Sequence, residues 1–290
     1  MQLVETPYLH FVPAGGLELA VWEWPGDDPP IVFAHATGFH GRCWDHIARL
    51  FPRRRALALE FRGHGRSGKP VPPIPSFGLT QDVLLVASHF GIRGALAVGH
   101  SMGGHSVVSA AIQQPAIFAA LVLVDPVIFP PEYYGAPPPD ASYILRRRDR
   151  WASPAEMLES FRSRPPFAAW LPEALRNYCE YALLPQGDSF VLACPPVVEA
   201  AIYGLCNAPE ANLYPGIPSI TQPVTVLRAG STQRRGSLDL SASPTAPDLA
   251  SRFPHGRDVF LPDHNHYIPM EAPDLVAAEI AHFWSNKSGR

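Results

Sequence analysis

Short apolar runs alternate with helix-like stretches along the first half of the chain. The runs are apolar on both faces, as in strands buried inside a parallel sheet, and lie at residues 31–34, 56–61, 95–98 and 120–126. Segments with helical character separate them, at residues 44–50, 79–90 and 102–113. Because strand and helix alternate, the pattern predicts the α/β class, with a mostly parallel central sheet and helices on both of its faces.

This alternation is preceded by a predicted hairpin and interrupted once. The hairpin strands are predicted at residues 8–12 and 17–22. From residue 127 to 221 no clear strand is seen, and helical patches occur at residues 140–150, 154–163, 171–183 and 195–206. Strands return at 223–229 and 258–262, before a closing helix at 274–284. We therefore expect an α/β core made of residues 1–127 and 222–290, and a helical lid made of residues 128–221.

A serine stands where one of the buried strands meets the next helix. Ser101 lies between Gly99 and Gly103, two residues from each. Such glycines are needed where a strand turns sharply into a helix and the residue at the apex takes a strained backbone conformation. A chance occurrence of this spacing is disfavoured by the strand before it and the helix after it. The pattern predicts a nucleophile elbow, with Ser101 as the nucleophile and the backbone N–H of Met102 as a donor to an oxyanion.

Composition and charge exclude several classes of partner. The formal net charge is −3, which provides no basic surface for nucleic acid. No apolar run approaches the length that spans a membrane, and the first ten residues lack the pattern of a secretory signal. The four cysteines show no C-x-x-C spacing and are interpreted as free thiols, with a pair among Cys179, Cys194 and Cys206 as the alternative. We expect a cytoplasmic protein that acts on a small molecule, without nucleic-acid or membrane partners.

Four motifs, taken in order, resemble those of the α/β-hydrolase fold. They are residues 35–38, similar to the H-G-x-x oxyanion loop; residues 60–67, similar to D-x-R-G-x-G-x-S; the elbow; and residues 266–273, similar to H-x-x-P-x-E-x-P. Ala36 and Glu60 depart from the usual glycine and aspartate. The resemblance, to esterase- or lipase-like serine hydrolases with a helical lid, implies that His266 is the catalytic base and that the Thr37 N–H is the second oxyanion donor.

Two members of the implied catalytic triad have competitors in the sequence. His264 lies in the same loop as His266, but the residues that follow it do not match the H-x-x-P-x-E-x-P motif. The family's acid usually follows the strand before the last, where this chain has no acid before Asp239. Asp125 occupies the family's other position, at the end of the strand after the elbow helix. We favour Asp125, with Asp239 and then Asp263 as alternatives.

Substrate-binding residues are predicted with less guidance from motifs. His35 of the oxyanion loop is one candidate, and Tyr133 and Trp151 are two others, because aromatic side chains of the lid are expected to line an apolar pocket. The arginine-rich run 146–150 is either a solvated helix face or a site for a substrate carboxylate. His264, His266 and Asp263 lack further ligands around them, so no metal is predicted. No cofactor is expected.

These residues favour one reaction class and leave others open. We expect a serine hydrolase that cleaves carboxylic esters through a Ser-His-Asp triad and an acyl-enzyme intermediate. Lactone, amide or C–C bond hydrolysis, and a cofactor-free perhydrolase reaction, use the same triad. A ligand-binding module without turnover belongs to a different class, and the presence of both the serine and the histidine argues against it.

Overall fold

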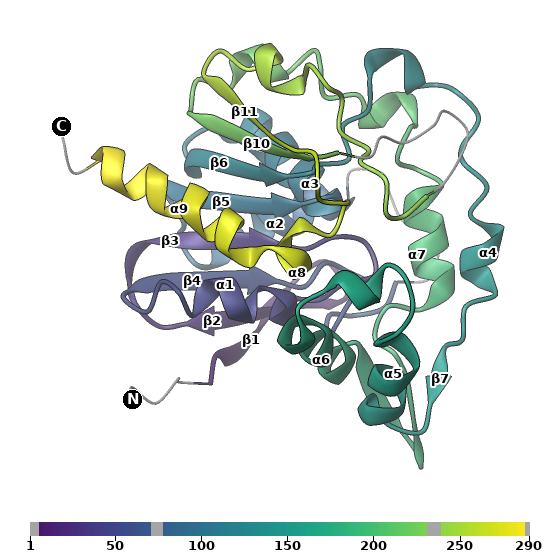
Figure 1. The fold of residues 1–290 in the computed structure, drawn as a ribbon. Coiled ribbons are helices and arrows are strands. Elements are labelled where there is room, and N and C mark those ends of the chain that lie inside the picture. The colour runs from purple at the N-terminus through teal and green to yellow at the C-terminus, as the bar shows by residue number, and fades with distance from the viewer. Residues whose placement is uncertain (1–5, 71–77, 231–238, 288–290) are drawn as a thin grey trace.

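The computed structural model describes residues 6–70, 78–230 and 239–287, which form one eight-stranded sheet and a smaller three-stranded one (Figure 1). The strand order in the large sheet is β1-β2-β4-β3-β5-β6-β10-β11. Its strands are Tyr8–Pro13 (β1), Glu18–Trp24 (β2), Asp27–Ala34 (β3), Arg54–Leu59 (β4), Ala95–His100 (β5), Phe118–Val124 (β6), Val224–Ala229 (β10) and Gly256–Leu261 (β11). From β4 to β11 neighbouring strands are parallel, whereas β1 and β2 are antiparallel at one edge. The predicted mostly parallel sheet is confirmed.

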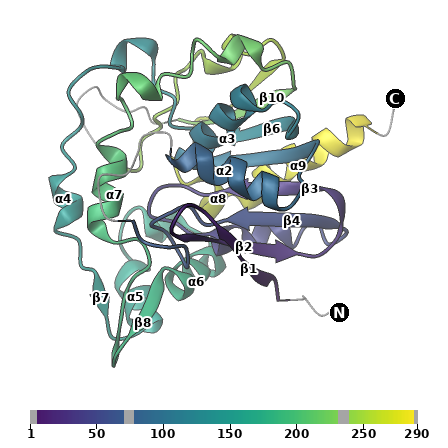
Figure 2. The ribbon, with the colours of Figure 1, turned by 180° about the vertical axis from the view of Figure 1, so that it is seen from behind.

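Helices cover both faces of the large sheet (Figures 1 and 2). One face carries α1 (Asp45–Ala48) and α9 (Pro273–Lys287), with the short α8 (Ile268–Glu271) before α9. The other face carries α2 (Gly78–His89) and α3 (Met102–Gln113). Every residue of β5 is buried between these two layers, which explains why its sequence is apolar without alternation.

The elbow depends on a close approach between α3 and the end of β3. A Cβ atom on Gly103 would clash with the backbone oxygen of Ala34, and one on Gly99 would lie 2.7 Å from the Cα of Gly104. Only glycine fits these positions. The contact places the loop that follows β3 directly beside Ser101.

The segment between β6 and β10, called the insertion below, contains strands as well as helices. Its helices are α4 (Ser142–Leu145), α5 (Pro154–Phe161), α6 (Pro172–Tyr181) and α7 (Pro196–Tyr203). Its strands β7 (Arg150–Trp151), β8 (Leu183–Gln186) and β9 (Ser189–Leu192) form the antiparallel sheet β7-β9-β8. The prediction of a segment without strands was therefore wrong, because strands of two to four residues are too short to show a period of two.

The remaining turns include short 3-10 helices, at Gly41–Trp44, Pro131–Tyr133, Phe167–Ala169, Pro209–Ala211, Ile217–Ser219 and Leu249–Arg252. An apolar cluster joins the insertion to loops at the carboxyl edge of the sheet, where Phe39 and Tyr267 meet Trp170 and Tyr178. The division of the chain into a core and a lid stays a prediction. All four cysteines are free, and no described helix is long and apolar enough to cross a membrane.

Candidate active site

Ser101, His266 and Asp125 form one hydrogen-bonded line at the carboxyl edge of the sheet. The distance from Ser101 Oγ to His266 Nε2 is 2.9 Å, and that from His266 Nδ1 to Asp125 Oδ2 is 2.7 Å. All three residues are buried. Since an ionised carboxylate only accepts hydrogen bonds, we assign the imidazole proton to Nδ1, which leaves Nε2 to accept the hydroxyl proton of Ser101.

The backbone of Ser101 has the strained conformation expected at an elbow. Its φ is 55° and its ψ is −118°, and α3 begins at the next residue. Asp125, which directly follows β6, is the other non-glycine residue with positive φ in the described chain, at 44°. Such values are uncommon and occur often at functional sites. Both strained residues therefore lie at the ends of neighbouring parallel strands.

The Asp125 carboxylate is held by three separate donors. Oδ2 faces His266, while Oδ1 accepts hydrogen bonds from the backbone N–H of Ala229 at 3.1 Å and from Ser243 Oγ at 2.6 Å. Ala229 ends β10, so the donor comes from the strand beside β6. The carboxylate thus has a fixed orientation and its buried oxygens are paired.

The loop that carries His266 is fixed from two sides. His100 Nε2 donates to the backbone oxygen of His266 at 2.9 Å, and the backbone N–H of His266 donates to Ser241 O at 2.9 Å. Burial, with a contribution from His266, lowers the pKa of His100 well below its usual value. A neutral His100 therefore supports the loop without adding a charge next to the base.

The competing residues of the sequence analysis lie elsewhere. His264 Nδ1 is 3.5 Å from Glu271 Oε2. The exposed Asp239 accepts hydrogen bonds through Oδ1 from Ser241 Oγ at 2.7 Å and from Ser241 N at 2.9 Å, and these bonds lower its pKa. Asp263 is exposed. Residues 231–238, just before Asp239, lie outside the described residues.

The loop after β3 presents Thr37 to the same space as Ser101. His35 links this loop to the residue Phe61, because its Nδ1 donates to Ala36 O at 2.8 Å and its Nε2 accepts a hydrogen bond from the N–H of Phe61 at 3.2 Å. Met102 is the first residue of α3, where backbone N–H groups have no partner within the helix. The backbone N–H groups of Thr37 and Met102 therefore belong to the two segments that lie next to Ser101.

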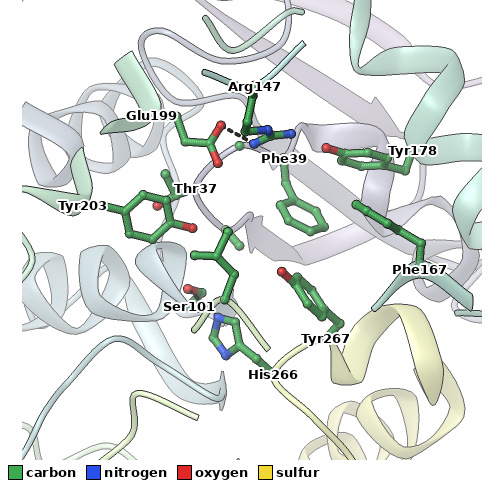
Figure 3. A pocket seen from close by; sticks show the side chains of 13 residues that line it. Thr37, Phe39, Ser101, Arg147, Phe167, Tyr178, Glu199, Tyr203, His266 and Tyr267 are labelled. Atoms are coloured by element: carbon green, nitrogen blue, oxygen red, sulfur yellow. Dashed lines mark hydrogen bonds and ion pairs between the residues drawn. The ribbon is translucent and has the colours of Figure 1, made fainter. Parts of the chain in front are cut away.

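A small pocket opens above Ser101, between the core and the insertion (Figure 3). The cavity has a volume of about 40 Å³. Its described lining residues are Ala36, Thr37, Gly38, Phe39, Ser101, Arg147, Phe167, Tyr178, Glu199, Tyr203, Leu240, His266 and Tyr267. Core and insertion therefore both contribute to the pocket.

The predicted substrate-binding residues are not part of this lining. His35 is buried with both ring nitrogens bonded to backbone groups. Tyr133 stacks on Phe129, and Trp151 is buried against Phe161 within the insertion. In their place, the structure brings Arg147, Glu199 and three tyrosines to the pocket. A lone acid within the apolar stretch of α7 was the available sequence signal for Glu199.

Arg147 and Glu199 form an ion pair at the end of the pocket opposite Ser101 in the view of Figure 3. The Glu199 side chain is 3% exposed and that of Arg147 is 26% exposed. Burial raises the pKa of Glu199, although the positive charge of Arg147 opposes this. Burial also acts against the charge of Arg147, but Glu199, Tyr178 and Tyr203 together outweigh it and raise the pKa of the guanidinium.

The three tyrosines of the pocket are Tyr178, Tyr203 and Tyr267. Burial raises the pKa of each phenol above its usual value. The hydroxyl groups are therefore neutral and able to donate or accept hydrogen bonds. Among the described residues, no cluster of three or more histidine, cysteine or acidic side chains has a geometry that would hold a metal ion.

Comparison with known proteins identifies the family. The chain is 26% identical to 2-(acetamidomethylene)succinate hydrolase of Mesorhizobium japonicum over 280 residues, which cover 94% of this chain and 93% of the relative. The crystal structure of E-2-(acetamidomethylene)succinate hydrolase matches with a TM-score of 0.78 at 22% identity, covering 96% of this chain and 99% of that one. The enol-lactonase of Burkholderia xenovorans LB400 matches with a TM-score of 0.68 at 20% identity, covering 95% and 100%. The sequence model of the alpha/beta hydrolase family matches residues 31–279. The protein thus belongs to the alpha/beta hydrolase family and is a hydrolase.

Proposed function

We propose that this protein cleaves carboxylic esters through an acyl-enzyme intermediate on Ser101. The observation that carries the proposal is the unbroken line of hydrogen bonds, 2.9 Å from Ser101 Oγ to His266 Nε2 and 2.7 Å from His266 Nδ1 to Asp125 Oδ2. A nucleophile, a base and a group that orients the base are all needed to activate a serine hydroxyl. A ligand-binding module without turnover would not need this alignment.

In the first half of the reaction, Ser101 Oγ attacks the acyl carbon while His266 Nε2 takes the hydroxyl proton. Asp125 stabilises the resulting imidazolium through Nδ1. The imidazolium then donates its proton to the leaving alkoxide, and the ester C–O bond breaks. In the second half, His266 removes a proton from water as the water attacks the acyl-enzyme. The imidazolium then returns the proton to Ser101 Oγ as the C–O bond breaks and the acid is released.

The negative oxygen of the tetrahedral intermediate requires fixed donors. We assign this role to the backbone N–H groups of Thr37 and Met102, which flank Ser101 from the β3 loop and from the start of α3. A donor of this kind contributes about 3–4 kcal/mol to stabilisation of the transition state. The positive end of the α3 dipole acts in the same direction.

The insertion is proposed to act as a lid that limits the size of the acyl group. Phe167, Tyr178 and Tyr203 of the insertion face Ser101 across a cavity of about 40 Å³. A single water needs about 10–15 Å³ by a comparable measure, so the pocket has room for only a few heavy atoms. We therefore expect short acyl chains to be the best substrates.

Amide hydrolysis is a second candidate, favoured by one comparison. The relative from Mesorhizobium japonicum, which matches nearly the whole chain, is named for a substrate with an acetamido group. The same triad serves an amide if His266 protonates the departing nitrogen. Lactone and C–C bond hydrolysis and the perhydrolase reaction would use the same residues with a different leaving group or nucleophile.

The proposal is tested with p-nitrophenyl esters of increasing acyl length and with the matching p-nitroanilides. We expect the acetate and propionate esters to react fastest and Ser101→Ala to lower kcat by roughly 10⁵-fold or more. Rapid labelling of wild type, but not of Ser101→Ala, by a fluorophosphonate would locate the nucleophile. Turnover that persists in Ser101→Ala would contradict the mechanism, and turnover of the anilides alone would favour the amide reaction.

A further inference from the structure

The pocket opposite Ser101 contains a paired cation and anion. Among the described lining residues, Arg147 is the only arginine or lysine and Glu199 the only acid. Arg147 comes from the turn between α4 and β7, whereas Glu199 comes from α7, and a hydrogen bond joins Arg147 Nη1 to Glu199 Oε2 (Figure 3). The tyrosines around them are neutral. The two charges therefore cancel before any substrate enters.

Glu199 cannot easily move aside for a substrate. Its side chain is 3% exposed, and α7 places it against the loop after β3. A Cβ atom built on Gly38 would lie only 3.1 Å from Glu199 Oε1, so the carboxylate fills the space that this glycine leaves open. Separating Glu199 from Arg147 would leave a buried carboxylate without its partner, which strongly disfavours such a movement.

These contacts decide how the pocket responds to charge. A buried arginine without an acidic partner would attract a substrate carboxylate and bind it through two N–H groups. Here one carboxylate already occupies Arg147, and a second would meet the negative charge of Glu199 in a confined space. Placing like charges together in a desolvated site strongly disfavours binding.

We infer that Glu199 determines the charge specificity of this enzyme: by neutralising Arg147, it selects substrates with uncharged acyl groups and rejects those that carry a carboxylate. The inference rests on the proposed function, since it concerns the acyl group transferred to Ser101. Arg147 has five N–H groups. Besides Glu199, Arg147 also interacts with Tyr178, and we expect its other N–H groups to donate to a neutral acceptor, such as a carbonyl or hydroxyl oxygen of the acyl group.

The test uses two esters that differ mainly in charge. They are p-nitrophenyl hydrogen succinate, which carries a carboxylate, and its methyl ester, which does not. For wild type we expect kcat/KM to favour the methyl ester by about tenfold or more. Glu199→Gln keeps the shape but removes the negative charge, and should shift the ratio of the two kcat/KM values about tenfold or more toward the succinate.

Two further variants separate charge from folding. The double variant Arg147→Gln/Glu199→Gln should lose the shift, because no cation remains to attract the succinate. Glu156→Gln removes a matched ion pair of the insertion, that with Arg148, which does not line the pocket. We expect Glu156→Gln to leave the wild-type ratio unchanged.

The outcomes distinguish this inference from the proposed function. A wild type that prefers the succinate overturns the inference, as does an unchanged ratio in a Glu199→Gln enzyme that still hydrolyses the methyl ester. The wild-type ratio needs no variant, so a preference for the succinate overturns the inference even if Glu199→Gln fails to fold. A wild type that hydrolyses neither ester although its Ser101 reacts with fluorophosphonate overturns the inference alone. A wild type that hydrolyses neither ester and whose Ser101 resists fluorophosphonate overturns the proposed function and the inference together.

Discussion

At the scale of single residues, the acid that faces His266 lies at the end of the strand that follows the elbow helix. The carboxylate that faces His266 belongs to Asp125, at the end of β6, and not to Asp239 beyond β10. Asp239 instead orders the turn at Ser241, whose backbone oxygen accepts the N–H of His266. Asp125 therefore contacts the ring of His266 directly, whereas Asp239 orders the turn that binds the backbone of His266.

This difference gives the first residue-scale prediction. Asp125→Asn should lower kcat by about 10⁴-fold, because an amide favours the wrong tautomer of His266 and cannot stabilise its imidazolium. Asp239→Asn should retain kcat within severalfold, since Ser241 can still donate to the amide oxygen. Steady-state kinetics on both variants, with circular dichroism to verify folding, provides the measurement. Near-wild-type activity of Asp125→Asn would rule out its assignment as the acid.

How far the site could be predicted from the sequence also differs from residue to residue. Ser101 and His266 lie in motifs with fixed spacing, so both could be identified from the sequence. Their catalytic roles stay predictions until the variants are measured. Arg147 and Glu199 are far apart in the chain and lie in an insertion without motifs. Their pairing depends on how α4 packs against α7, and no local pattern encodes that contact.

At the scale of elements, apolar runs were the reliable signal. The buried strands from β3 to β6 and the family resemblance were predicted and are confirmed, because strands covered on both faces must be continuously apolar. The hairpin of β8 and β9 was missed. Its turn contains Gly187 with a φ of 61°, but Pro185 and the few residues on each side conceal any alternation.

The contact between α3 and β3 gives an element-scale prediction. Gly103→Ala should force the start of α3 away from the backbone oxygens of Ala34 and His35, and so displace Ser101 and the Met102 N–H from Thr37. We expect kcat/KM to fall about 100-fold, as for displacements near 1 Å, and the free energy of unfolding to fall by about 1–3 kcal/mol.

Gly204→Ala is the matched control for that experiment. Gly204 also flanks a helix, at the end of α7, but a Cβ atom there would come no closer than 3.4 Å to its neighbours and its φ is −65°. Both activity and stability should stay close to those of wild type. Ester kinetics and urea unfolding on the two variants are compared directly, and equal effects would show that the close approach at Gly103 does not matter.

At the scale of the whole molecule, several histidines are buried in their neutral form. Burial lowers the pKa of His40 and of His64 to about 3. The same cause lowers the pKa of His35, His100 and His105. These rings support backbone groups around the site, as His40 does through Tyr178 O at 3.0 Å. The architecture at the carboxyl edge therefore depends on neutral imidazoles.

The last prediction follows from this dependence. In the unfolded chain a histidine takes up a proton near pH 6.5, whereas folded His40 and His64 do not until about pH 3. Their contribution to stability is thus complete above pH 6.5 and is lost as the pH falls toward 3, by about 1.4 kcal/mol per pH unit for each residue. Urea unfolding at pH 7.5, 6.5 and 5.5 measures the slope, and His64→Asn should reduce it by the share of one histidine. An identical slope in wild type and His64→Asn would show that His64 is not held neutral by the fold.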